Sequence, residues 1–211
     1  MKNTLMNSQN MLTGQDSQSI GTPSAVVVLL VEGRLGVNKI LVIRRPKRMK
    51  AYPGDWCFPG GRWEPGDSSL VDTAWRELEE ETAIPQQACH SLQSMDDFFS
   101  GKGDLIRPFL VRITQAQFDH YFKACKEEVA CSALIELDRL DDMNTGSPAG
   151  KTSTRDPSYF FTFTHDNACE NLWGLSASIL VHFHNVRRGL AKPVDYGERY
   201  LDRKEANCEH H

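Results

Sequence analysis

The stretch from residue 58 to residue 84 constrains this chain most, because it joins a glycine-rich turn to an acidic helix. Its turn and cap signals are Gly60-Gly61, Pro65-Gly66 and Ser68-Ser69. Pro85 follows the last helical position and should end the helix. Arg76 lies nine residues after Asp67, and we expect an ion pair between them that holds the turn against the helix. The pattern therefore predicts a turn and a helix that act as one unit.

The last turns of this helix carry glutamates at positions 77, 79, 80 and 81. At about 100° per residue, Glu77 and Glu81 lie one turn apart, with Glu80 on the adjoining strip. Such neighbours repel each other by about 0.3 kcal/mol per pair in a solvated helix. A hard divalent cation would offset the repulsion, because Mg²⁺ prefers oxygen ligands and substrate phosphates. The alternative is a solvated acidic face, which we assign to Glu79.

The order of these residues resembles the Nudix box, Gly-x5-Glu-x7-Arg-Glu-apolar-x-Glu-Glu-x-Gly-apolar. The matching residues are Gly61, Asp67 and the segment Arg-Glu-Leu-Glu-Glu-Glu-Thr-Ala-Ile at 76–84. Asp67 replaces the first Glu of the pattern, and the spacer from Asp67 to Arg76 is one residue longer. Both departures resemble the coenzyme A diphosphatase branch of the family. Ala83 replaces the last Gly, which predicts a helix end without a left-handed glycine.

The resemblance implies an α/β protein with the Nudix fold, a mixed β-sheet sandwiched between α-helices. It also implies a pyrophosphohydrolase that uses Mg²⁺ or Mn²⁺ and splits a diphosphate through attack by water. Glu77 and Glu81 are the principal predicted metal ligands, and Glu80 is a third ligand or the catalytic base. Glu128, in a later segment, is a further candidate for base or ligand, and an exposed strand-edge acid is the equal alternative.

A basic segment at residues 44–58 runs directly into the box and carries five Lys or Arg residues between positions 44 and 50. Next to a metal site these cations favour contacts with phosphates, although a solvated loop can have the same composition. The predicted substrate-binding residues are Arg44, Arg45, Lys50, Gly60 and Gly61. The segment resembles the coenzyme A diphosphatase pattern Leu-Arg-x-His-x-Gly, with Tyr52 at the His position.

Apolar runs at 25–31 and 40–43 predict a β-hairpin at the start of the folded part. Further strands are predicted over 92–99, 105–113 and 158–164, a short helix over 114–126, and a loop over 141–157. An amphipathic helix is predicted over 171–186, a segment that resembles the Nudix pattern Ile-Trp-Gly-x-Thr-Ala-x-Ile-Leu. His182 and His184 point different ways on that helix and are predicted to be surface residues.

These features predict a Nudix domain at 23–188, preceded by a disordered tail at 1–22 that is rich in Asn, Gln and Ser. A C-terminal extension follows at 189–211, and its final His210-His211 resembles the end of a purification tag.

Composition excludes several other classes of protein. The net charge of −4 and the lack of a long basic tract argue against binding of duplex nucleic acid. The six cysteines show no Cys-x-x-Cys pair and no zinc spacing, which favours free thiols in a reducing compartment. No apolar run approaches the roughly 20 residues of a membrane span, and the N-terminus lacks a signal sequence. We therefore expect a soluble cytoplasmic protein without membrane partners.

The function that the resemblance implies is hydrolysis of coenzyme A or its derivatives to 3′,5′-ADP and 4′-phosphopantetheine. The same chemistry on ADP-ribose, NADH or another nucleotide sugar is the first alternative. A non-catalytic Nudix module that senses a nucleotide is the second. The expected partner is a small nucleotide substrate, and a homodimer is left open because Nudix domains often form dimers.

Overall fold

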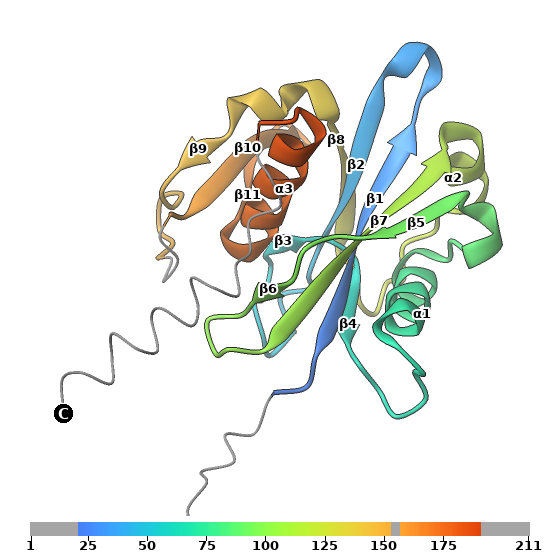
Figure 1. Cartoon of the computed structure of the whole chain (residues 1–211). Coiled ribbons are helices and arrows are strands. Elements are labelled where there is room, and N and C mark those ends of the chain that lie inside the picture. Colours follow the sequence, from blue (N-terminus) through green and yellow to red (C-terminus); the bar gives the residue numbers. More distant parts are fainter. Residues whose placement is uncertain (1–20, 153–156, 191–211) are drawn as a thin grey trace, which may run out of the picture.

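The computed structural model describes residues 21–152 and 157–190, in which a larger mixed sheet packs beside a smaller antiparallel one (Figure 1). The larger sheet contains β1 (Ser24–Glu32), β2 (Asn38–Arg44), β3 (Trp56–Cys57), β4 (Gly60–Arg62), β5 (Ser91–Ser94), β6 (Phe98–Phe99), β7 (Leu105–Thr114) and β8 (Cys131–Glu136). The smaller sheet contains β9 (Asn144–Thr145), β10 (Tyr159–His165) and β11 (Ala168–Trp173). The helices are α1 (Leu70–Thr82), α2 (Gln115–Tyr121) and α3 (Gly174–Arg187).

β1 is the central strand of the larger sheet, in which the main strand order is β3-β2-β1-β7-β5. It pairs antiparallel with β2 and parallel with β7. Residues 27–31 are buried without alternation, because β1 has a packed layer on each face. The predicted hairpin of runs 25–31 and 40–43 is confirmed, with a short 3₁₀ turn at Arg34–Gly36 between the strands.

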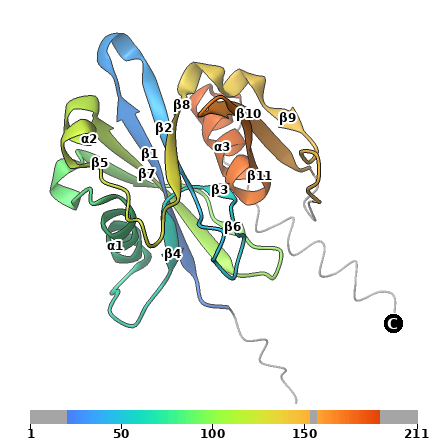
Figure 2. The same ribbon diagram turned by 180° about the vertical axis from the view of Figure 1, so that it is seen from behind.

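Each face of the larger sheet has its own apolar core. α1 covers the face that includes Val27 and Leu29, and it buries Ala74 and Leu78 there. α3 and the smaller sheet cover the opposite face, on which Trp56 and other apolar side chains are buried. Figures 1 and 2 show α1 and α3 on opposite sides of the sheet. The predicted arrangement of a mixed sheet between helices is confirmed.

Local chemistry sets both ends of α1. The Ser69 hydroxyl accepts the N–H of Asp72 at 3.3 Å and caps the helix. Full burial of Leu78 contributes about 2 kcal/mol and anchors the helix on the sheet. Ala83 ends the helix with φ of +57°, and its N–H donates to the Glu79 carbonyl at 2.8 Å. Ala83 thus adopts the left-handed conformation itself, although it is not a glycine.

The prediction of a helix over 171–186 is wrong in its first turn. Residues 171–173 belong to β11, and α3 begins at Gly174, whose φ of +62° turns the chain from strand to helix. Asp166 and Asn167, with φ of 48° and 62°, form the tight turn that joins β10 to β11. Leu172 is fully buried. A single buried apolar residue occurs in strands as well as in helices, so periodicity alone could not distinguish the end of β11 from the start of a helix.

The prediction that His182 and His184 lie on the surface is also wrong. His182 is 4% exposed and His184 is 8% exposed. His182 Nε2 lies 2.8 Å from Asp96 Oδ2, and His184 Nε2 lies 2.9 Å from Asp141 Oδ1. These acids come from segments distant in the chain, so helical spacing could not reveal them. Each buried imidazole is stabilised by a carboxylate that tertiary packing brings to it.

Other predicted elements are present with shifted bounds. The run 92–99 divides into β5 and β6, and the helix expected within 114–126 is α2, capped by the Thr114 hydroxyl. The loop at 141–157 contains the short β9. The predicted tail, 1–22, and extension, 189–211, lie almost wholly outside the described residues. Within the described part of the chain, no helix combines the length and apolarity needed to cross a membrane.

Candidate metal centre

Carboxylates from two distant parts of the chain converge at one end of α1. Glu77, Glu81 and Glu128 each offer an oxygen, and these oxygens lie within 4.8 Å of one another. We call these residues the acid cluster. Glu81 is only 4% exposed, the Glu77 side chain is 12% exposed, and Glu128 is exposed. The cluster is therefore open to solvent on the side of Glu128 and closed on the side of the helix.

The loop between α2 and β8 carries Glu128 to the cluster because it binds the end of α1. The last carbonyls of a helix lack partners within the helix. Here the N–H of Lys123 donates to the Thr82 carbonyl at 2.9 Å, and the N–H of Cys125 donates to the Glu81 carbonyl at 3.0 Å. The helix that carries two acids of the cluster therefore also places the third.

Burial and mutual repulsion disfavour negative charge in the cluster. The pKa of Glu81 is raised to about 8, mainly by burial and also by the charges of Glu77 and Glu128. The Gly60 N–H, which donates to Glu81 Oε2 at 2.9 Å, and the charge of Arg45 oppose this rise. Burial also raises the pKa of Glu77, which Arg76 partly offsets. A divalent cation would favour the ionised forms and remove the repulsion.

The Gly60-Gly61 turn packs directly on the cluster, and a side chain would meet the backbone of β1 at Gly60 and the Glu77 carboxylate at Gly61. A Cβ atom on Gly61 would lie 2.1 Å from Glu77 Oε1. A Cβ atom on Gly60 would lie 2.4 Å from the Ala25 carbonyl oxygen, and φ of Gly60 is +149°. The glycines of the sequence pattern thus allow the turn to approach both β1 and the acids.

The ion pair expected between Asp67 and Arg76 is present and joins the turn to α1. Arg76 Nε and Nη2 donate to the two oxygens of Asp67, both at 3.0 Å. The Thr73 hydroxyl donates to the same carboxylate at 2.8 Å. Arg76, first among these groups, holds the pKa of Asp67 well below its usual range. The shorter Asp side chain therefore still reaches Arg76 across the longer spacer.

Glu80 lies outside the acid cluster in this structure. Its Oε2 accepts from Arg76 Nη1 at 3.0 Å, and its side chain is 52% exposed. Arg76 Nη1 also donates to Glu77 Oε1 at 2.9 Å. Arg76 thus lies between Glu80 and the cluster. The i, i+4 spacing of Arg76 and Glu80 was a sequence signal for this pair.

The adjacent residues Arg44 and Arg45 point to opposite faces of the sheet, as successive strand residues do. Arg45 faces the acid cluster, where its charge lowers the pKa values of Cys57 and Glu81. Arg44 faces the smaller sheet, where its Nη1 donates to Glu170 Oε1 at 2.8 Å. Lys50 is exposed on the β2–β3 loop, residues 45–55. The structure therefore brings Arg45, but not Arg44, to the acids.

Two further contacts, one on each face of the sheet, involve residues outside the set predicted from the sequence. Arg48 Nη2 donates to the carbonyls of Lys126, at 3.2 Å, and Glu127, and so links the β2–β3 loop to the segment before Glu128. Glu170 on β11 accepts from Arg44 and also from Trp56 Nε1, at 3.1 Å. Arg48 belongs to the basic segment, but no local pattern marks Glu170.

Residues 21–132 match the model of the NUDIX domain family. This match spans more than half of the chain and includes the turn, α1 and Glu128. The chain belongs to the Nudix family. Nudix enzymes hydrolyse pyrophosphate bonds in small nucleotide substrates and generally use divalent metals such as Mg²⁺. The carboxylate oxygens of the acid cluster are the hard donors that suit such a cation.

Relatives of this Nudix protein include the uncharacterized Nudix hydrolase NudL of Yersinia enterocolitica, which is 30% identical over 141 residues. That alignment covers 67% of this chain and 70% of the relative. NudL of Yersinia pestis is 30% identical over 143 residues, which cover 68% of this chain and 69% of the relative.

Similar solved structures include a MutT/nudix family protein from Enterococcus faecalis, with a TM-score of 0.49 and 16% identity over 77% of this chain and 54% of that chain. A C. elegans Ap4A hydrolase has a TM-score of 0.42 and 19% identity over 55% of this chain and 80% of that chain.

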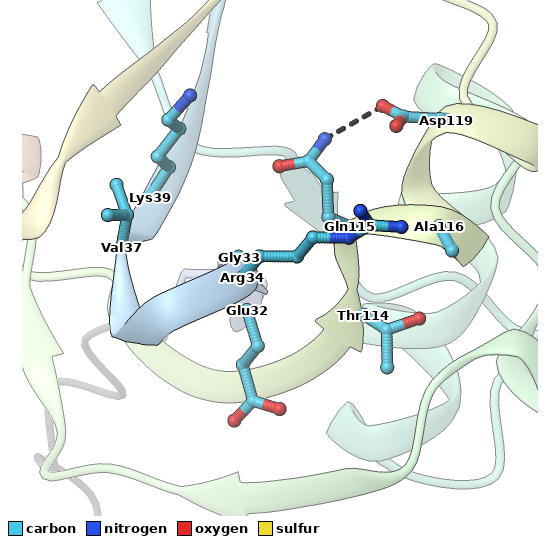
Figure 3. A pocket seen from close by; sticks show the side chains of 9 residues that line it. All are labelled: Glu32, Gly33, Arg34, Val37, Lys39, Thr114, Gln115, Ala116 and Asp119. Atoms are coloured by element: carbon cyan, nitrogen blue, oxygen red, sulfur yellow. Dashed lines mark hydrogen bonds between the residues drawn. The ribbon is translucent and has the colours of Figure 1, made fainter.

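A cavity of about 610 Å³ lies at the other end of β1 from the acid cluster (Figure 3). Its lining combines both signs of charge, with Glu32 and Asp119 against Arg34 and Lys39. Gln115 Nε2 donates to Asp119 Oδ1 at 2.7 Å within it. None of the predicted site residues lines this cavity, so it is separate from the candidate metal centre of the Nudix domain.

Proposed function

We propose that this protein is a Mg²⁺- or Mn²⁺-dependent Nudix diphosphatase that cleaves coenzyme A or its derivatives to 3′,5′-ADP and 4′-phosphopantetheine. The observation that carries the proposal is the convergence of Glu77, Glu81 and Glu128 beside the Gly60-Gly61 turn. Like charges that are partly buried together destabilise a folded protein unless a cation neutralises them. Such a cluster supports a metal-dependent function over a purely structural one.

In this proposal Glu77 and Glu81 hold the cation, and Glu128 either completes the metal shell or serves as the base. When bound, the cation stabilises charge on the phosphoryl oxygens and makes water a stronger nucleophile. Glu128 and Glu80 are the candidates for the general base. Glu128 is exposed at the open side of the cluster and can accept a proton from water there. Glu80 would first have to leave Arg76.

The residues around the cluster have complementary roles in binding the diphosphate. Arg45 and Lys50 supply positive charge to the phosphates. Gly60 and Gly61 let the substrate approach the backbone, because they carry no side chain next to Glu77 and β1. Arg44 faces the other side of the sheet, where it contacts Glu170.

The assignment to coenzyme A is supported by the sequence of the box, in which Asp67 and a longer spacer precede Arg76. Their paired hydrogen bonds are compatible with that variant of the box. Tyr52, where the branch usually has His, favours the same hydrolysis on ADP-ribose, NADH or another nucleotide sugar as the alternative. Its side chain is on the exposed surface of the β2–β3 loop.

The proposal is tested by mass spectrometry of the products after separate incubations with coenzyme A, ADP-ribose and NADH in Mg²⁺ or Mn²⁺. We expect 3′,5′-ADP from coenzyme A with the wild type and no product with Glu77→Gln. Glu79→Gln is the matched control, because Glu79 is an exposed acid of the same helix. Cleavage of the other substrates alone would retain the reaction and reject coenzyme A. Stabilisation by the metal without turnover of any of them would favour a nucleotide sensor.

A further inference from the structure

Glu170 links the smaller sheet to the larger one through both oxygens of its carboxylate. Oε1 accepts from Arg44 Nη1 at 2.8 Å, and Oε2 accepts from Trp56 Nε1 at 3.1 Å. The Glu170 side chain is 18% exposed, and Trp56 is 3% exposed. Charge-assisted hydrogen bonds with little access to water are stronger than exposed ion pairs. The contact therefore fixes the orientation of the Arg44 guanidinium.

Arg44 also contacts the β2–β3 loop and the strand that follows it. Its Nε donates to the Gly54 carbonyl at 3.0 Å, and its guanidinium lies 5.7 Å from the centre of the Trp56 ring. The loop closes at the same point, because the N–H of Arg45 donates to the Asp55 carbonyl at 2.9 Å. Glu170 is therefore connected to the base of the loop indirectly, through the side chain of Arg44.

The same loop has a second contact with the C-terminal part of the described chain. Lys151 Nζ lies 2.7 Å from Asp55 Oδ1, and the ammonium lies 5.1 Å from the centre of the Trp173 ring. Lys151 is 41% exposed on its side chain, so its pairing is the weaker of the two. The less exposed Glu170 is therefore the main candidate to control the loop.

We infer that Glu170 is a positioning residue, which holds the β2–β3 loop through Arg44 so that Arg45 and Lys50 meet the substrate phosphates. This inference rests on the proposed function for its kinetic consequence. It assigns Arg44 an indirect role, because Arg44 lies on the opposite face of the sheet from Glu81 and is engaged by Glu170. A loop held in place before binding loses less conformational entropy when the substrate binds.

A direct phosphate contact by Arg44 would have the opposite consequence. In that case Glu170 would compete with the substrate for the guanidinium, and loss of its charge would strengthen substrate binding. If Glu170 positions the loop, loss of its charge weakens binding. The sign of the change in KM therefore separates the two roles.

The test is the near-isosteric Glu170→Gln, which keeps one acceptor but loses the charge and the second acceptor. We expect KM to rise about tenfold, with kcat and the metal concentration for half-maximal activity nearly unchanged. Glu136→Gln is the matched control, because Glu136 is an exposed acid at the other end of β2 and should behave as wild type. A lower KM, or a change confined to kcat, would overturn the inference.

The pathway through Arg44 is tested with Arg44→Gln and the double variant. If Glu170 acts through Arg44, Glu170→Gln should add little to the KM of Arg44→Gln. Fully additive effects would show that Glu170 acts by another route and would refute the assignment.

Amide hydrogen exchange on the metal-free and substrate-free protein tests the loop directly. Glu170→Gln should increase exchange at the amides of Arg45 and Gly54, while the amides of α1 keep wild-type rates. Unchanged exchange in the loop would reject the positioning role even if the kinetics changed. This measurement needs no turnover, so a protein that hydrolyses none of the substrates would fail the proposed function without deciding the role of Glu170.

Discussion

The two helices that cover the larger sheet differ in the partners of their buried polar side chains. On α1, Glu77 and Glu81 lie close to another acid, Glu128, and burial raises the pKa values of both helical residues. On α3, the buried His182 and His184 each face a carboxylate, at 2.8 and 2.9 Å. Gathered charges of one sign repel each other, and a cation from outside the protein would offset that repulsion, whereas each histidine has a carboxylate partner within the protein. The comparison separates the proposed metal site on α1 from stabilising contacts on α3.

The largest expected effect is on turnover and comes from the helix α1. Glu81→Gln should reduce turnover by at least about 10²-fold, because it removes a buried oxygen charge at the proposed cation site. Steady-state assays with excess Mg²⁺ or Mn²⁺ measure this loss, with Glu79→Gln as the exposed control on the same helix. Wild-type turnover by Glu81→Gln would remove Glu81 from the proposed site and contradict the functional contrast between α1 and α3.

The same variant should change how stability depends on pH. The pKa of Glu81 is about 8 in the metal-free folded protein and about 4.5 in its ordinary state. Between these pH values the folded protein keeps a proton that the unfolded chain releases, so the free energy of unfolding falls as pH rises. We expect the wild type to lose roughly 3–5 kcal/mol relative to Glu81→Gln between pH 4.5 and 8.

Denaturant unfolding of both proteins in EDTA at several pH values measures this difference. Adding Mn²⁺ at pH 8 should then raise the Tm of the wild type and leave that of Glu81→Gln nearly unchanged, because the cation binds the ionised cluster. If the difference in free energy of unfolding between the wild type and Glu81→Gln did not vary with pH, the raised pKa of Glu81 would be contradicted.

A change on α3 should affect stability and leave metal binding alone. His182→Ala removes the partner of Asp96 and a ring contact with Phe98, whose centroid lies 5.7 Å away. We expect a loss of about 2 kcal/mol in the free energy of unfolding. Isothermal titration with Mn²⁺ should give the wild-type affinity. A weaker metal affinity in this variant would show that the two faces are coupled.

The smallest expected effect concerns Arg48, which links the β2–β3 loop to the segment of Glu128. Arg48→Ala should lower Mn²⁺ affinity about threefold, because Glu128 is then held less firmly, and should change stability by less than about 0.5 kcal/mol. Lys47→Ala is the matched control, since Lys47 is an exposed cation of the same loop. Equal affinities for both variants would show that Arg48 does not support Glu128.

The sequence allowed most of the larger sheet to be predicted. Continuous apolar runs of β-favouring residues, such as those of β1 and β2, indicate a strand whatever packs against them. It was less successful after residue 165, where the turn at Asp166-Asn167 and the strand before Gly174 were missed. A short strand next to a helix shares apolar positions with that helix, so the boundary depends on which residues find a pairing strand.

Contacts between near neighbours in the chain could be predicted from the sequence. These are the Ser69 cap, the closeness of Glu77 and Glu81, and the ion pair of Asp67 with Arg76. Spacing on a helix or in a short turn sets such contacts before the rest of the chain folds.

The distant residues that join this site are brought there by the packing of the folded chain. Glu128 reaches the cluster because its loop binds the end of α1, and Arg44 turns to Glu170 because the smaller sheet covers its face. These outcomes depend on which surfaces the folded chain brings together, and local periodicity carries no information about that choice.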